Sequence, residues 1–170
     1  MVLPIVKEPD KILHTKMVPV PKITPEIRRL ITDMIQTMHA AEGVGLAANQ
    51  VGSPLDILVA SADGRKGEEW VLINARIIER KGRFRSPEGC LSIPGVSAEV
   101  TRSAEVKVRG LDLQGKELTL SASGLMAKIL QHETDHLAGL LYVDRLSPWK
   151  RGQLLRKYRR LRSSLSRIKL

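Results

Sequence analysis

The chain has 170 residues, with 28 Lys and Arg against 18 Asp and Glu, 42% hydrophobic residues, 3% aromatic residues and one cysteine. These values fit a single globular domain with an aliphatic core, and one cysteine excludes an internal disulfide framework. No apolar run approaches membrane-spanning length, and residues 1–10 lack the pattern of a signal peptide. We therefore expect a cytoplasmic protein without a membrane span.

The positive charge is concentrated at the C-terminus. Residues 147–170 contain nine of the 28 Lys and Arg and no Asp or Glu, so the preceding 146 residues hold 19 basic against 18 acidic side chains. The sequence therefore predicts a nearly neutral main part of the domain at 1–148 and a basic helical extension of the same domain at 149–170. Any anionic partner would meet that extension.

The first thirty residues contain five prolines and predict a loop-rich lead-in. Thr24-Pro25-Glu26 is typical of a helix start, with Thr as N-cap and proline in the first turn. Apolar residues then recur at helical spacing to Met38, which predicts an amphipathic helix.

Strand-like patterns follow at 55–60, 70–78, 104–111 and 116–120, separated by turn signals such as Asp63-Gly64 and Gln114-Gly115. A helix, several short strands and then further helices indicate an α+β fold rather than a wound α/β sheet. We expect mostly antiparallel strands around a central helix, with an amphipathic helix before them and a basic helix after them.

The central helix is expected at 125–138, begun by Ser121 or Ser123 and ended by Gly139. It carries His132, Glu133 and His136 in the H-E-x-x-H spacing, which places both imidazoles on one helix face. This pattern favours a metal site with Glu133 as a proton carrier, and the alternative is a pair of buried core histidines.

Cys90 is the only thiol in the chain. A free cysteine is often a small buried hydrophobic residue, but a thiolate here would be a third metal ligand that leaves a fourth position open. Spacing along the sequence does not decide between these two interpretations.

Three segments together resemble the signature motifs of the peptide deformylase family, in the family's order: Gly43-Val44-Gly45-Leu46-Ala47-Ala48-Asn49-Gln50, Glu88-Gly89-Cys90-Leu91-Ser92 and Gln131-His132-Glu133-Thr134-Asp135-His136-Leu137-Ala138-Gly139. The resemblance implies a metal-dependent hydrolase that removes the N-formyl group from N-formylmethionine of nascent peptides and releases formate.

The resemblance also implies a role for each matching residue. The metal ligands are then Cys90, His132 and His136, and Glu133 is the general acid and base for a metal-activated water. The side chain of Gln50 and the backbone N–H of Leu91 would stabilise the oxyanion. The metal would be Fe(II) in the cell, and the same ligands also suit Zn(II), Ni(II) and Co(II).

For the substrate, the resemblance implies backbone pairing with Gly45 and Gly89. The methionine side chain would enter an apolar pocket formed by Val44, Leu125 and Ile129. Two rival functions remain: an H-E-x-x-H endopeptidase, which would need a His or Glu ligand downstream of His136, and an inactive RNA-binding relative, which would have lost part of the site.

In the basic extension, apolar residues step by three or four positions, which predicts an amphipathic helix. The stripe consists of Leu154, Tyr158, Leu161, Leu165 and Ile168. Such a helix could pack on the domain, lie on a membrane surface or contact nucleic acid. Because the substrate emerges from the ribosome, we favour ribosomal RNA near the exit tunnel as its partner, and we expect a monomer.

Overall fold

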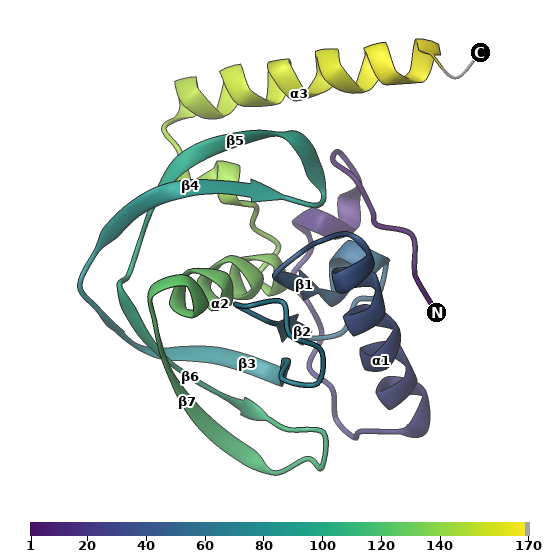
Figure 1. Cartoon of the computed structure of the whole chain (residues 1–170), viewed down its shortest axis with the longest axis vertical. Helices are drawn as coiled ribbons and strands as arrows, with labels where there is room; N and C mark the ends of the chain where they lie inside the picture. The colour runs from purple at the N-terminus through teal and green to yellow at the C-terminus, as the bar shows by residue number, and fades with distance from the viewer. Residues whose placement is uncertain (169–170) are drawn as a thin grey trace.

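A five-stranded antiparallel sheet and a two-stranded hairpin enclose a central helix in the computed structural model (Figure 1). The model describes the backbone of residues 1–168 and the side chains of residues 1–164. The helices are α1 (Pro25–Ala40), α2 (Gly124–Leu137) and α3 (Pro148–Ile168), with short 3-10 turns at η1 (Lys11–His14), η2 (Ala48–Val51) and η3 (Tyr142–Arg145). The strands are β1 (Gly45–Ala47), β2 (Ile57–Ala60), β3 (Trp70–Lys81), β4 (Phe84–Cys90), β5 (Ile93–Arg102), β6 (Glu105–Leu111) and β7 (Glu117–Ser123).

The larger sheet has the order β1-β2-β3-β6-β7, and every neighbouring pair is antiparallel. The hairpin β4–β5 pairs Cys90 with Ile93 around a two-residue turn. Within the described part of the chain, β1 and β4 each have one partner strand. Each therefore keeps one edge of backbone N–H and C=O groups open for pairing.

The predicted α+β class is confirmed, and β2, β3, β6 and β7 occupy the four predicted strand segments. Three strands were not predicted: β1, β4 and β5. Strand β1 is only three residues long, whereas β4 contains Pro87 and Gly89 and follows no apolar alternation. Both are edge strands, whose pairing depends on tertiary neighbours more than on local pattern.

Helix α1 begins as predicted, because the Thr24 side chain accepts a hydrogen bond from the N–H of Ile27 and proline occupies the first position. Its face of Ile31, Met34 and Met38 is buried in one core cluster with residues of β1 and β2. The predicted amphipathic helix is therefore confirmed.

Helix α2 lies between the sheet and the hairpin and is buried along most of its length (Figure 1). Ser123 occupies the predicted N-cap position, but its side chain makes no capping hydrogen bond. The position was therefore predicted correctly and the capping interaction was not. Gly139 follows the helix at φ +76°, and an added Cβ there would lie 2.8 Å from the backbone carbon of Thr15. Only glycine fits this close turn.

Helix α3 packs across the outer face of β5 (Figure 1). Leu155 and Tyr158 are its buried contacts, in one core cluster with Val96 and Val100. The predicted stripe was therefore partly wrong: Leu154 is only half-buried and Leu161 is exposed, because the hairpin contacts a face rotated toward Leu155. Leu165 and Ile168 lie outside the described side chains. Over the described residues, every helix is too short or too polar to cross a bilayer.

Candidate metal centre and active site

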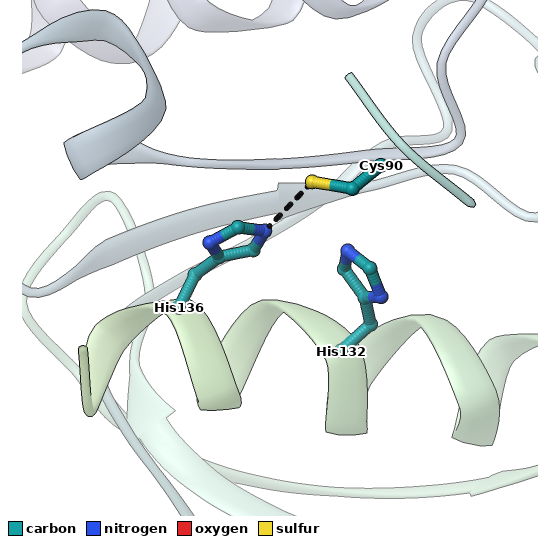
Figure 2. Close-up of side chains that lie close together, drawn as sticks. All are labelled: Cys90, His132 and His136. Atoms are coloured by element: carbon teal, nitrogen blue, oxygen red, sulfur yellow. Dashed lines mark hydrogen bonds between the residues drawn. The ribbon is translucent and has the colours of Figure 1, made fainter. Parts of the chain in front are cut away.

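Three side chains with metal-ligating atoms converge where the end of β4 faces α2. Cys90 comes from β4, and His132 and His136 come from successive turns of α2 (Figure 2). Their ligand atoms all lie within 4.8 Å of one another, and Cys90 Sγ is 3.2 Å from His136 Nε2. Ligands bound at about 2.0–2.3 Å to one tetrahedral ion lie roughly 3.5 Å apart. The cluster therefore fits a single divalent cation.

The environment of Cys90 favours the thiolate, the form that binds metals. Burial of the thiol opposes ionisation, but the charges and hydrogen bonds of His136 and His132 hold its pKa well below the usual value. The backbone N–H of Ser92 and the Nε2 of Gln50 also face Sγ, at 3.4 and 3.5 Å. Geometry thus favours the ligand interpretation of Cys90 over an inert buried thiol.

The two histidines present the same ring nitrogen to the cluster. His132 Nδ1 lies 3.0 Å from Glu88 Oε2, which leaves Nε2 free to face Cys90. His136 presents Nε2 directly, and its backbone carbonyl accepts a hydrogen bond of 2.8 Å from the Asn49 side chain. The Glu88 contact holds the His132 imidazole in an orientation suited to metal binding, whereas His136 Nδ1 has no hydrogen-bond partner among the described residues.

A buried chain of charges stands behind His132. Both carboxylate oxygens of Glu88 accept hydrogen bonds from Arg102, at 2.8 and 2.9 Å, and Arg102 also donates to Asp135 at 2.6 Å. Arg145 completes the chain from the surface side of Asp135. Although burial opposes it, hydrogen bonds from Arg102 and His132 lower the pKa of Glu88 to about 2, so this carboxylate is ionised where it holds the imidazole.

Sequence reasoning missed most of this charged chain. Glu88 belongs to the segment that carries Cys90, which was a usable signal, but Arg102 has no local pattern that marks it. Asp135 lies within the segment that carries both histidines, and the structure buries it between Arg102 and Arg145.

Glu133 is buried beside the cluster, and its Oε2 has no hydrogen-bond partner among the described residues. Burial raises the pKa of this carboxyl above its ordinary value. An added Cβ at Gly45 would overlap Glu133 Oε1 and lie 2.8 Å from Ile129 Cγ2, so β1 approaches the carboxylate as closely as glycine allows. The unpartnered oxygen is therefore available to accept and release a proton.

Gln50 is held rigidly at the opposite side of Cys90. Its Oε1 accepts a hydrogen bond of 2.9 Å from Ala47 N, and its Nε2 donates to Ser92 Oγ at 3.2 Å. Leu91 forms the turn between β4 and β5, and its carbonyl accepts a hydrogen bond of 2.5 Å from Lys7 Nζ. Lys7 was not predicted, because nothing in the lead-in sequence indicates that it reaches this turn.

A cavity of about 450 Å³ opens over the cluster and is bounded by the open edges of β1 and β4. It is lined by ten of the eleven predicted site residues, and His136 lies behind its wall. Val44 and Leu125 are exposed at its sides, and Ile129 is buried at its base. The half-buried Lys128 also lines the cavity and donates a hydrogen bond to the Pro87 carbonyl.

Comparisons with known proteins identify one family. The polypeptide deformylase family profile matches residues 2–152. Peptide deformylase 2 of Nitrosomonas europaea is 45% identical over 159 residues, covering 94% of this chain and 86% of the relative. The peptide deformylase of Aquifex aeolicus is 44% identical over 167 residues, covering 96% and 99%.

The fold agrees as closely as the sequence. A crystal structure of a peptide deformylase from Legionella pneumophila superposes with a TM-score of 0.94 at 40% identity, covering 98% of this chain and 99% of that one. A thiol and two imidazoles around one point, an unpartnered carboxylate and a matching fold over nearly the whole length leave one assignment: the chain belongs to the polypeptide deformylase family.

Proposed function

We propose that Cys90, His132 and His136 hold the catalytic metal ion of this deformylase and that Glu133 is its general acid and base. As a member of its family, the chain is a metal-dependent hydrolase that removes the N-formyl group from nascent peptides. One observation carries the assignment of roles: the unpartnered Glu133 carboxylate lies beside the three ligands in the cavity wall.

A divalent ion held by the three ligands would act as a Lewis acid and lower the pKa of a water at the site. The Oε2 of Glu133 accepts a proton from the water that attacks the formyl carbon. It then delivers that proton to the amine nitrogen as the C–N bond breaks, so that formate and a free α-amine leave. Gln50 Nε2 and the Leu91 N–H donate to the formyl oxygen as it gains negative charge.

We infer that the metal in the cell is Fe(II), with Zn(II), Ni(II) or Co(II) as replacements in purified protein. Two imidazoles and one thiolate suit all four ions. The test is formate release from a short formyl-methionyl peptide by protein purified without oxygen and reloaded with each metal. Faster release with iron than with zinc supports Fe(II) as the metal in the cell. If folded, metal-loaded protein released no formate with any of the four metals tested in turn, the proposed roles of the residues would be refuted.

The substrate peptide is proposed to lie as an added strand between β1 and β4. The open edges of these strands face one cavity, so the backbones at Gly45 and Gly89 can pair with an extended peptide. Val44, Leu125 and Ile129 then provide the apolar wall for the methionine side chain. Backbone pairing explains how one enzyme accepts many peptide sequences.

Substitution of Gly45 by alanine is expected to lower kcat/KM by on the order of 10²-fold, because the new methyl group displaces the Glu133 carboxylate. Gly89→Ala is the matched comparison, since its Cβ would meet only the Val96 carbonyl at 3.6 Å, an ordinary contact. Formate release and metal content are measured for both variants. An equal fall in kcat/KM in the two variants would show that the effect does not come from displacement of Glu133 by a side chain on β1.

Gln50→Ala is expected to lower kcat by about 10²–10³-fold, the usual cost of one lost oxyanion donor. Residual activity should remain, because the Leu91 N–H and the metal still face the oxyanion. The Gln50 amide also faces Cys90 Sγ, so metal content must be measured beside formate release. A proportional loss of metal would assign the defect to the ligand cluster instead.

We further propose that α3 contacts ribosomal RNA near the exit tunnel and that the protein acts as a cytoplasmic monomer. The helix buries Leu155 and Tyr158 against β5, whereas Arg156, Lys157, Arg159 and Arg160 are exposed. Packing on the domain and contact with an anionic partner are therefore compatible, because they use different faces of α3. Phosphate contact would explain the accumulation of charge.

Replacement of Arg156, Lys157, Arg159 and Arg160 by glutamine is expected to abolish ribosome binding while peptide deformylation continues. Truncation at Pro148 is a poorer test, because it also removes the buried Leu155 and Tyr158. Wild-type binding should weaken steeply with salt. A control variant neutralises four basic residues on other surfaces: Lys22, Arg28, Arg29 and Arg109. Salt-insensitive binding, or equal loss in the control, would refute the RNA contact.

A further inference from the structure

A second cavity has a volume of about 250 Å³. The β3–β4 turn, which contributes to its lining, lies on the side of the molecule away from α1 (Figure 1). The cavity is formed where the β3–β4 turn, the end of β5 and η3 come together. Four arginines line it, Arg80, Arg83, Arg102 and Arg145, against one carboxylate, Asp135. Arg102 and Arg145 belong to the charged chain behind His132, whereas Arg80 and Arg83 have no part in the proposed deformylation chemistry.

Two of the four arginines have no compensating charge. Arg102 is paired with Glu88 and Asp135, and Arg145 is paired with Asp135. Among the described residues, Arg80 and Arg83 form no ion pair, and both are exposed at the cavity rim. Like charges that share one cavity repel each other, so the arrangement is stabilised when an anion enters between them.

The remaining lining offers hydroxyl donors and no free carboxylate. Both oxygens of Asp135 already accept hydrogen bonds, from Arg102 and Arg145. The hydroxyls of Thr101 and Ser103 line the same cavity and have no hydrogen-bond partner within the described part of the chain. A cation would find only two neutral hydroxyls beside four guanidinium groups, whereas an oxyanion would find two unpaired guanidinium groups and two hydroxyl donors.

We propose that this cavity is a phosphate-binding site in which Arg80 and Arg83 hold the ligand and Arg145, Thr101 and Ser103 complete its hydrogen bonds. The planar guanidinium group matches two oxygens of a phosphate at once, which a lysine does not. The volume accommodates a phosphate group together with several waters at about 30 Å³ each. The same chemistry serves a free phosphate or phosphate monoester and a phosphate of an RNA backbone. The site is independent of the proposed RNA contact of α3.

The test is a titration of zinc-loaded protein with inorganic phosphate at constant ionic strength, followed residue by residue by nuclear magnetic resonance. We expect saturable shifts at the Arg83 and Ser103 amides and at the Arg80 and Arg83 side chains. The double variant Arg80→Gln/Arg83→Gln should raise the dissociation constant roughly tenfold or more, because two charge-assisted contacts are lost. Phosphate that binds only at the metal would shift the residues around Cys90 instead and would overturn the proposal.

The matched control is Arg28→Gln/Arg29→Gln on α1, which removes the same charge from exposed positions outside the cavity. It should bind phosphate like the wild type, and both double variants should release formate normally, which verifies their folds. If phosphate affinity fell equally in both double variants, the effect would follow from net charge alone and the proposed site would be refuted.

A second arm distinguishes the two sources of phosphate by adding a short RNA oligonucleotide. If the cavity serves an RNA backbone, the oligonucleotide displaces phosphate and binds the Arg80/Arg83 variant more weakly. If it serves a free phosphate, that variant loses phosphate binding and keeps its RNA affinity. The α3 variant lacking Arg156, Lys157, Arg159 and Arg160 should still bind phosphate in the cavity. The two proposals can therefore fail separately, because ribosome binding tests one and phosphate binding by the Arg80/Arg83 variant tests the other.

Discussion

Replacement of Glu133 by glutamine is expected to lower the rate of formate release by roughly 10²–10⁴-fold, the usual contribution of a positioned general base. Glutamine has nearly the same shape, but its amide cannot take a proton from the attacking water. The metal should stay bound, because Cys90, His132 and His136 are unchanged. Deformylation of a formyl-methionyl peptide and metal content by elemental analysis measure both parts of this expectation.

Two further variants make the Glu133 result interpretable. Glu117→Gln alters an exposed carboxylate at the start of β7 and should retain full activity. His132→Ala should lose both activity and metal, which separates loss of a ligand from loss of the base. If Glu133→Gln stayed within a few-fold of wild type, the unpartnered Oε2 would have no role in proton transfer.

Local chemistry explains which parts of the site could be predicted. His132 and His136 share one helix face, because a spacing of four residues determines that arrangement wherever the helix lies, and Glu133 adjoins them in the sequence. Cys90 is 42 residues before His132, so its role needed the resemblance of the whole segment to a known motif. Once both are placed, the distance of 3.2 Å between Cys90 Sγ and His136 Nε2 agrees with that expectation.

The parts that were not predicted depend on contacts distant in sequence. Strands β1 and β4 are short or irregular, and they form because the sheet and the hairpin pair around α2. The ion pairs of Glu88, Arg102 and Asp135 join two strands and a helix, and no periodicity indicates which charged residues will be buried together. In α3, the stripe was correct in period but rotated toward Leu155, because the hairpin decides which face is covered.

Arg102→Met is expected to destabilise the fold by about 3–5 kcal/mol, the usual cost of breaking a buried ion pair from one side. Arg102 is 5% exposed and donates to both oxygens of Glu88 and to Asp135. Methionine fills similar space but leaves these two carboxylates without their shared partner. For a chain of this size, the loss corresponds to a fall in melting temperature on the order of 10 °C.

Denaturant unfolding of Arg102→Met should be measured both with a chelator and with saturating zinc, because a bound metal stabilises the folded state. Arg85→Met is the matched control: its ion pair with Glu99 on the same hairpin is exposed, at 3.6 Å, and should contribute no more than about 1 kcal/mol. Arg102 also holds Glu88 in place against His132 Nδ1, so zinc affinity should fall in Arg102→Met and not in Arg85→Met. If stability fell without any change in zinc affinity, Arg102 would support the fold alone, and the Glu88–His132 contact would be sufficient by itself to orient the ligand.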